Sequence, residues 1–194
     1  MTKYILQGGG QKKFSFKKYL NLWRLLNFIP KKSKVLMVFF ARPKEEWEKL
    51  CNEAKSFRFL LARWDIDYIL ASDDQSEFIE QIKECNVIYF RGGNTPMLQE
   101  KLENISNLQE LLKDKIVIGS SAGSLVFTKY YYDQDYDQIF GGLNFLNVKM
   151  ITHYKSTGEY ASTSGDDKLK MLKEHKEELP VYAIRETEFV ILDK

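Results

Sequence analysis

Short, mostly apolar runs alternate with amphipathic stretches along most of the chain, and apolar positions in those stretches repeat every three to four residues. The run at 34–40 (KVLMVFF) is almost wholly apolar, which is typical of a strand covered on both faces. The strands predicted in the first part of the chain are 3–7, 34–40, 67–71, 86–90 and 116–118. This alternation predicts a three-layer, doubly wound α/β fold with helices on both faces of a mostly parallel sheet.

Three consecutive glycines, Gly8–Gly10, follow the first predicted strand. They match neither GxGxxG nor GxxxxGK[ST], so we expect a loop at the carboxyl edge of the sheet rather than a nucleotide site. Apolar residues at helical spacing then predict a first helix: Phe16, Tyr19, Leu20, Trp23, Leu25 and Leu26. Further along, Ser72–Asp74 offers a helix N-cap, and Thr95 is the expected N-cap of a helix with Pro96 at its first position.

Length and charge set broad limits on function. A chain of 194 residues fits a single domain, 1–194, and its net charge of +2 gives no strong electrostatic case for nucleic acid or an anionic membrane. Cys51 and Cys85 lie far apart without metal-ligand spacing, so we expect free thiols and neither a cofactor nor a metal. No run approaches the ~20 apolar residues of a membrane span. We expect a soluble cytoplasmic protein, monomeric or homodimeric.

The pattern Gly119-Ser120-Ser121-Ala122-Gly123 follows three apolar residues and precedes a helix-like segment. Such a GxSxG pattern is typical of a nucleophile elbow, in which small neighbours let the backbone turn sharply and expose the serine. Ser121 is therefore the candidate nucleophile, and the amide of Ala122 is a candidate oxyanion donor. A small-residue turn without chemistry is the alternative explanation of this pattern.

A second glycine turn, Gly92-Gly93, follows the predicted strand 86–90. Ligands of open parallel sheets sit at the carboxyl ends of the strands, where this turn and Ser121 both fall. Two glycines let a backbone amide approach a substrate carbonyl, so Gly93 is the candidate second oxyanion donor. Arg91 and Asn94 flank the glycines and are candidate substrate-binding residues. A plain tight turn is the alternative.

A serine nucleophile needs a base, and the chain contains only two histidines. His175 lies in a charged helical run, which is typical of a solvated histidine. His153 ends the strand-like run 148–152, whose exit is expected at the carboxyl edge, so His153 is the candidate base. A hydrogen-bonded structural histidine remains the alternative.

The orienting acid is less determined by the sequence. Three carboxylates, Asp133, Asp135 and Asp137, stand in an acidic and aromatic segment between the nucleophile and the base. Any of them could hold the imidazole, and a solvated loop would explain them equally well. Glu159 and Glu186 remain alternatives.

Together these motifs resemble the dipeptidase E and cyanophycinase family of serine peptidases. The resemblance covers residues 34–192 and rests on GGNT at 92–95, GxSAG at 119–123, the segment 130–137, Gly142-Leu143 and His153-Tyr154. It implies a fold like that of class I glutamine amidotransferases, also described as flavodoxin-like. It also implies Ser121 as nucleophile, His153 as base, Gly93 and Ala122 as oxyanion donors, and an acid within 133–137. Asp135 is preferred because its distance along the chain from Ser121 is similar to that of the acid in the family.

Two departures from the family bear on the substrate. Arg91 stands where members often carry a glycine, which puts a guanidinium near the expected cleft. Segment 162–167 lacks the arginine with which aspartyl dipeptidases of the family hold an N-terminal aspartate. We therefore expect a peptidase for short peptides without a strict demand for that residue. The alternative function is a catalytically silent module that keeps the fold and binds a small ligand or a protein partner.

Overall fold

The computed structural model describes residues 1–10, 20, 23–60 and 65–194, and only the backbone of 57–60. The predicted helix positions Phe16 and Tyr19 lie outside the described residues. Residues 23–26 are helical, in agreement with the rest of that prediction.

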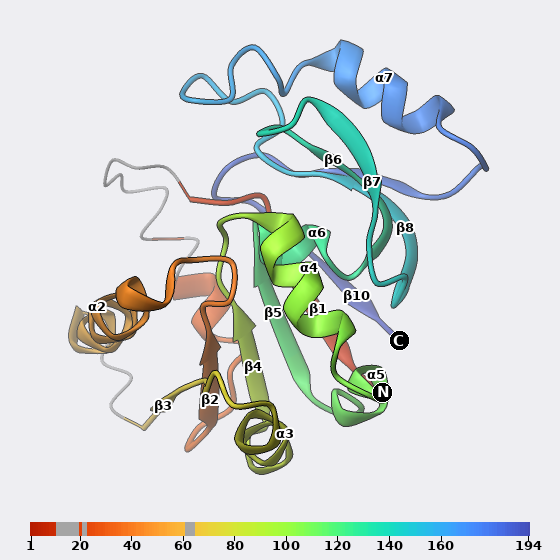
Figure 1. Cartoon of the computed structure of the whole chain (residues 1–194). Coiled ribbons are helices and arrows are strands. Elements are labelled where there is room, and N and C mark those ends of the chain that lie inside the picture. Colours follow the sequence, from red (N-terminus) through yellow and green to blue (C-terminus); the bar gives the residue numbers. More distant parts are fainter. Residues whose placement is uncertain (11–19, 21–22, 61–64) are drawn as a thin grey trace.

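A six-stranded sheet forms the centre of the molecule (Figure 1). Its strands, in spatial order, are β10 (Phe189–Asp193), β1 (Lys3–Gln7), β5 (Ile116–Ser120), β4 (Val87–Phe90), β2 (Lys34–Val38) and β3 (Asp67–Leu70). All neighbours pair in parallel except β10, which runs antiparallel to β1. Four of the five residues of β2 are buried, as expected for a strand between two helical layers. The predicted α/β class with a mostly parallel sheet is confirmed.

Helices connect the parallel strands. They are η1 (Lys44–Glu46), α2 (Trp47–Leu60), α3 (Gln75–Glu84), α4 (Thr95–Glu103) and α5 (Leu108–Leu111). Right-handed crossovers place α2 on one face of the sheet and α3 and α4 on the other, where Figure 1 shows the latter two in front of the strands. None of the helices that the structure describes has the length and apolarity needed to cross a bilayer.

The N-cap of α3 agrees with the prediction, and the N-cap of α4 lies one residue earlier than predicted. Asp74 caps α3 by accepting a hydrogen bond from the amide of Glu77, as the Ser72–Asp74 signal suggests. The cap of α4 is Asn94, whose Oδ1 accepts from the amide of Met97 at 2.8 Å, and not Thr95. Thr95 is instead the first helical residue, and its buried hydroxyl donates to the carboxylate of Asp133.

A second, four-stranded sheet packs beyond the carboxyl edge of the first, at the top of Figure 1. Its order is β7 (Gln138–Gly141), β6 (Thr128–Asp133), β8 (Leu146–Ile151) and β9 (Val181–Ala183), and α7 (Asp166–Glu174) packs against it. The segment 130–137, expected as a loop, is therefore mostly the hairpin of β6 and β7. Its tyrosines explain the difference, because Tyr131 is buried and stacks on Phe140 of the partner strand.

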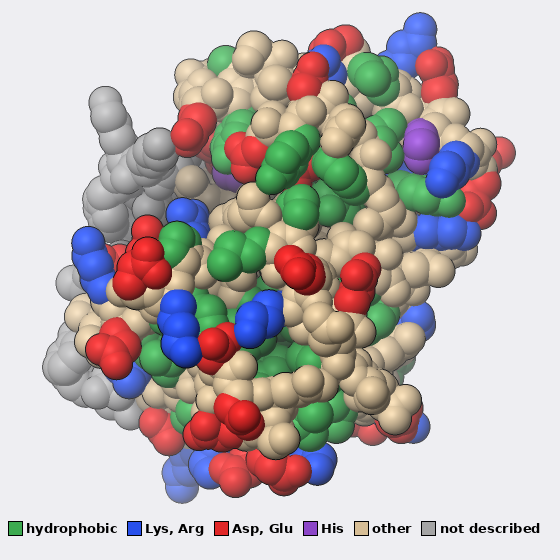
Figure 2. Space-filling model, viewed as in Figure 1, with side chains coloured by type: hydrophobic (Ala, Val, Ile, Leu, Met, Phe, Trp, Pro, Cys, Tyr) green, Lys and Arg blue, Asp and Glu red, His purple; other side chains and the backbone are tan. Residues whose placement is uncertain are grey.

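The strand register brings distant loops to one edge. Gly119 of β5 lies opposite Leu6 of β1 and Phe90 of β4, so the residues after these three strands are neighbours. Those residues are Gly8–Gly10, 91–94 and Ser121, all of which the sequence had marked. On the face shown in Figure 2, acidic and basic side chains are interspersed, in keeping with the small net charge.

Candidate active site

Ser121 occupies a strained turn between β5 and α6 (Ala122–Leu125). Its backbone has φ 51° and ψ −115°, a conformation that L-residues rarely adopt, and its amide donates to the carbonyl of Gln7 at 3.1 Å. The surrounding backbone leaves no room for side chains: a Cβ on Gly119 would lie 2.2 Å from the carbonyl oxygen of Gly123, and one on Gly123 would lie 2.1 Å from that of Phe90. The two glycines of GxSxG are thus required by close packing, as a nucleophile elbow demands.

His153 follows β8 and reaches across from the second sheet to Ser121. Its Nε2 lies 3.0 Å from Ser121 Oγ, and its side chain is 9 % exposed. The backbone of His153 also has positive φ, 49°, and its amide donates to the carbonyl of Gly8 at 2.9 Å. The structure therefore brings together the two residues that the sequence selected as nucleophile and base.

The glycine run after β1 lies directly behind the imidazole. Gly9 has φ +96°, and a Cβ there would lie 2.3 Å from His153 Cε1. Its carbonyl accepts a hydrogen bond from the amide of Thr187 at 2.8 Å. The run therefore forms a backbone wall beside the His153 ring and the segment at Thr187, at the carboxyl edge where a loop was expected.

The carboxylate beside His153 is Glu186, and the preference for Asp135 is corrected on this geometry. Glu186 Oε1 lies 3.2 Å from His153 Nδ1, and Ser156 Oγ donates to the same oxygen at 2.9 Å. The Glu186 side chain is 16 % exposed, which limits screening of this charge by water. Nδ1–H donating to Glu186 leaves Nε2 free to accept the Ser121 proton, which is the arrangement of a Ser-His-acid triad.

Asp135 instead lies on the far side of a tyrosine. Its carboxylate accepts a hydrogen bond from the hydroxyl of Tyr160, and the Tyr160 ring packs against the His153 ring with centroids 4.5 Å apart. Burial, followed by the charge of Asp135, raises the pKa of the Tyr160 hydroxyl. Asp133 is buried behind this pair, and burial raises the pKa of its carboxyl above the ordinary value. Asp135 thus reaches the base only through Tyr160.

Of the two amides expected as oxyanion donors, that of Ala122 belongs to the elbow and that of Gly93 to the turn packed against it. Ala122 is the first residue of α6, so its N–H has no acceptor within the helix. Gly92-Gly93 packs against the elbow, since a Cβ on Gly92 would lie 2.9 Å from Ser121 Cβ. A Cβ on Gly93 would lie 2.1 Å from the carbonyl oxygen of Ala41, so the glycine is required where the loop after β2 supports this turn.

The two residues expected to bind substrate have other contacts. Asn94 caps α4 with Oδ1, and its Nδ2 donates to the hydroxyl of Tyr136 at 3.0 Å. Arg91 forms a side-chain hydrogen bond with Tyr89, and the electrostatic interaction with Tyr89, followed by that with Glu53, raises the pKa of the guanidinium. Neither contact points to a substrate group.

The remaining candidates lie away from this cluster. His175 ends α7 and packs edge-on against Tyr130, and burial with Lys176 and Lys149 lowers its pKa. Both cysteines are buried thiols whose pKa values are raised by burial. Among the residues that the structure describes, no group of three or more metal-ligating side chains comes together.

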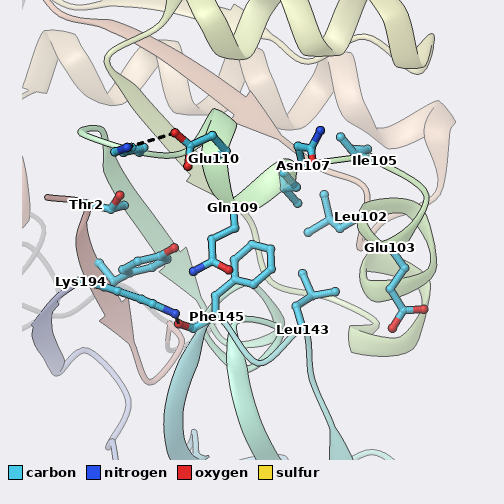
Figure 3. A pocket seen from close by; sticks show the side chains of 13 residues that line it. Thr2, Leu102, Glu103, Ile105, Asn107, Gln109, Glu110, Leu143, Phe145 and Lys194 are labelled. Carbon is cyan, nitrogen blue, oxygen red and sulfur yellow. Dashed lines mark hydrogen bonds and ion pairs between the residues drawn. The ribbon is translucent and has the colours of Figure 1, made fainter.

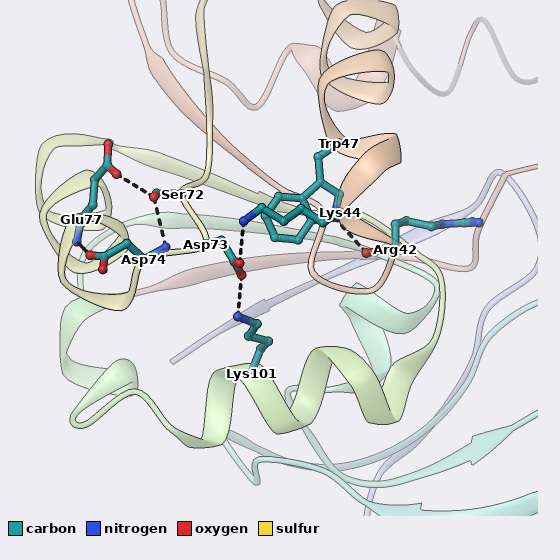
Figure 4. A network of polar contacts seen from close by, with 8 residues as sticks. All are labelled: Arg42, Lys44, Trp47, Ser72, Asp73, Asp74, Glu77 and Lys101. Carbon is teal, nitrogen blue, oxygen red and sulfur yellow. Dashed lines mark hydrogen bonds and ion pairs between the residues drawn. The ribbon is translucent and has the colours of Figure 1, made fainter.

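Two pockets lie outside the Ser121 cluster. One, of about 650 Å³, opens between the amino end of β1, α5 and the start of β8, and is lined by residues such as Tyr4, Gln109 and Phe145 (Figure 3). The other, of about 600 Å³, lies beyond the carboxyl end of β3, where Asp73 bridges Lys44 and Lys101 (Figure 4). The lining of neither includes Ser121, His153 or Glu186.

Glu186 had a weak signal in the sequence. It stands three residues before β10, and because β10 is antiparallel to β1 its amino end lies at the carboxyl edge of the sheet. The amide of Gly8 and the carbonyl of Glu188 are 3.0 Å apart there. An acid just before a final antiparallel edge strand was the pattern that could have identified it.

Comparisons with known proteins agree with this geometry. The sequence matches the model of peptidase family S51 over residues 4–194, and a search of curated proteins found no match. A peptidase from an acI-B1 Actinobacterium has a TM-score of 0.68 at 21% identity, over 99% of this chain and 83% of its own. A putative peptidase E protein from Listeria monocytogenes EGD-e has a TM-score of 0.64 at 19% identity, and the match covers 99% of this chain and 98% of its own. Both share the fold, and the family match shows that the chain belongs to peptidase family S51 and is a serine-type peptidase.

Proposed function

We propose that this peptidase hydrolyses short peptides by acyl transfer through Ser121, His153 and Glu186. The observation that carries the proposal is the continuous chain from Ser121 Oγ to His153 Nε2, 3.0 Å, and from His153 Nδ1 to Glu186 Oε1, 3.2 Å. Both distances suit hydrogen bonds of a nucleophile, base and orienting acid. The complete arrangement favours an enzyme over the silent binding module considered from the sequence.

The reaction follows from the positions of these groups. Ser121 Oγ attacks the peptide carbonyl carbon while His153 Nε2 accepts the hydroxyl proton, and Glu186 stabilises the imidazolium that forms. Collapse of the tetrahedral intermediate breaks the C–N bond, and His153 returns the proton to the leaving amine. Water, activated by the same imidazole, then hydrolyses the ester on Ser121 and regenerates the enzyme.

The oxyanion is assigned to two backbone amides. Ala122 N–H follows the nucleophile directly and lacks a helical acceptor, and Gly93 N–H belongs to the turn that packs against Ser121. Backbone donors fixed by packing need no reorganisation when charge develops on the substrate oxygen, and the loss of one donor typically costs ~10²–10³ in kcat.

Short peptides of varied sequence are the proposed substrates. Tyr136 and Tyr160 are aromatic side chains close to the cluster, and aromatic walls suit small extended ligands. Where aspartyl dipeptidases of the resembling family carry an arginine, this chain has Ser164-Gly165-Asp166. Residues 162–167 include no Lys or Arg that could bind a carboxylate, and Asp166 of this segment pairs with Lys155 at 3.0 Å.

A peptide panel tests the proposal. Purified wild type and Ser121→Ala are incubated with dipeptides and tripeptides whose first residue is acidic, neutral or basic, and released amines are quantified. We expect cleavage of several classes by wild type and a loss of several orders of magnitude in the variant, since triad serines can account for ~10⁶ in kcat. Equal activity of the two proteins would refute the nucleophile, and cleavage only after N-terminal aspartate would refute the substrate range.

A further inference from the structure

The last residue of β2 and the loop after it support the proposed oxyanion turn at several points. The amide of Arg91 donates to the carbonyl of Val38, and that of Asn94 donates to the carbonyl of Ala41, both at 2.9 Å. Gly93 approaches Ala41 so closely that no side chain fits between them. The position of the Gly92-Gly93 peptide is thus set by residues that the strand register places beside it.

Arg42 adds a charged contact to this support. Its Nε–H donates to the carbonyl oxygen of Gly92 at 2.8 Å, and its side chain is partly buried. Its own backbone is fixed twice: its amide donates to Phe39 at 2.8 Å and its carbonyl accepts from the indole of Trp47 at 2.9 Å. Figure 4 shows Arg42 extending away from the cluster of Lys44, Asp73 and Lys101.

In a trans peptide the carbonyl of one residue and the N–H of the next point in opposite directions. A donor bound to the Gly92 carbonyl therefore fixes the direction of the Gly93 N–H, and a cationic donor also polarises that peptide and strengthens the N–H as a donor. We propose that Arg42 is a positioning residue that holds the Gly92-Gly93 peptide with its amide directed at the substrate oxyanion. This role rests on the proposed function, in which Gly93 is an oxyanion donor.

Arg91, the arginine that the sequence marked as a candidate substrate-binding residue, does not supply this contact. Arg91 is adjacent to Gly92 along the chain, but its guanidinium bonds to Tyr89 and its nearby charge is Glu53 of α2. Arg42 is 50 positions from Gly92, and only the pairing of β2 with β4 brings the two loops together. Contact with the carbonyl behind the amide, not adjacency in sequence, identifies the cation that acts on this turn.

Two nearly isosteric variants isolate the donor. Arg42→Gln keeps an N–H donor on the atom bonded to Cδ, and Arg42→Met keeps a similar chain length without any donor. Lys44→Met is the control, because it removes a cation of the same segment whose ammonium pairs with Asp73 at 2.9 Å. Thermal melts and circular dichroism verify folding before kcat and KM are measured on a cleaved peptide.

We expect kcat to fall ~10–100-fold in Arg42→Met with KM within about twofold, less than the ~10²–10³ for loss of an oxyanion donor itself. Arg42→Gln should recover part of kcat, and Lys44→Met should match wild type. The affinity of a peptide boronic acid, which forms a tetrahedral adduct on serine, should fall in proportion to kcat/KM. A merely structural role would not move these three readouts together.

Labelling of Ser121 by a fluorophosphonate separates the possible failures. Wild type that is neither labelled nor active would overturn the proposed function, and the role of Arg42 with it. A labelled, active wild type whose kcat matches that of Arg42→Met would overturn the role of Arg42 alone. That role would equally be overturned if Arg42→Gln were no better than Arg42→Met, or if KM changed while kcat did not. If Arg42→Met does not fold, the affinities of Arg42→Gln and wild type for the boronic acid are compared instead. Equal affinities would refute the role of Arg42.

Discussion

The imidazole of His153 is held on three sides by side chains from different parts of the chain. Ser121 faces Nε2, Glu186 faces Nδ1, and Tyr160 packs against the ring at 4.5 Å between centroids. The acceptor at Nδ1 selects the tautomer with its proton on that nitrogen, so Nε2 is the basic atom. In the proposed reaction, this geometry directs the proton of Ser121 to Nε2.

Replacement of the orienting acid distinguishes Glu186 from Asp135. Glu186→Gln keeps the shape of the side chain but removes the charge that stabilises the imidazolium, so kcat should fall strongly, though less than in Ser121→Ala. Asp135→Asn should have a much smaller effect, because its carboxylate contacts Tyr160. Steady-state kinetics of both variants on one peptide measure this order, and a larger loss in Asp135→Asn would contradict the assignment.

Local chemistry explains which site residues the sequence could identify. Ser121 lies in a five-residue pattern that specifies its own turn, and His153 was selected because the chain holds only two histidines. Glu186 is 33 positions from His153, and its approach depends on the pairing of β10 with β1. No local spacing encodes that contact, so an acid closer along the chain was preferred.

The glycine run after β1 acts as an element of the site. Gly9 has φ +96° and faces the His153 ring, whereas a Cβ on Gly10 would meet no atom within 4 Å. Gly9→Ala should therefore displace the imidazole and lower kcat well beyond any effect on stability, and Gly10→Ala should remain close to wild type. Kinetics and thermal melts of the matched pair test this. Equal kcat values in the two variants would show that the wall does not position His153.

Asp73, in the loop before α3, joins η1 and α4 away from Ser121 and His153. Its carboxylate pairs with Lys44 of η1 at 2.9 Å and also with Lys101 of α4. The hydrogen bond from Lys101, followed by the one from Lys44, lowers the pKa of the Asp73 carboxyl. A carboxyl whose folded pKa is depressed stabilises the fold above its unfolded pKa, ~3.9, and loses that contribution as pH falls through the folded value.

Asp73→Asn should consequently lower the urea midpoint at neutral pH, and the difference from wild type should shrink as pH falls below ~4. Glu110→Gln is the control, because Glu110 of α5 forms an exposed pair with Lys113, and such pairs contribute little to stability. Urea titrations across pH compare the variants. A midpoint difference for Asp73→Asn that is independent of pH would contradict the electrostatic explanation.

At the level of elements, the parallel strands were predicted well because strands buried on both faces have nearly continuous apolar sequences. The second sheet was predicted only at β8. Its strand β6 reads Thr-Lys-Tyr-Tyr-Tyr-Asp, and its tyrosines pack on β7 and α7 only once the two sheets are assembled. Buried Lys149 of β8 likewise gains its acceptors from folding: its ammonium donates to the carbonyls of Lys173 and His175 at the end of α7.

Across the whole molecule, the site lies where the two sheets meet. Ser121 follows β5 and Glu186 precedes β10, both in the large sheet, whereas His153 follows β8 in the small one (Figure 1). His153 thus meets Ser121 and Glu186 only when the two sheets are docked. The parallel strands of the large sheet were predicted from periodicity, but the docking of the second sheet depends on contacts between segments that are distant along the chain.

The central claim is that Ser121 is a nucleophile activated by His153. Intact-mass and peptide mass spectrometry after treatment with a fluorophosphonate measure it directly in wild type, Ser121→Ala and Ser124→Ala, since Ser124 is a buried neighbour whose hydroxyl donates to the carbonyl of Gln7. The account predicts one covalent adduct, on Ser121, in wild type and in Ser124→Ala, and none in Ser121→Ala. An adduct that persists in Ser121→Ala would contradict this claim. So would a wild-type protein that hydrolyses peptides but carries its adduct on a residue other than Ser121.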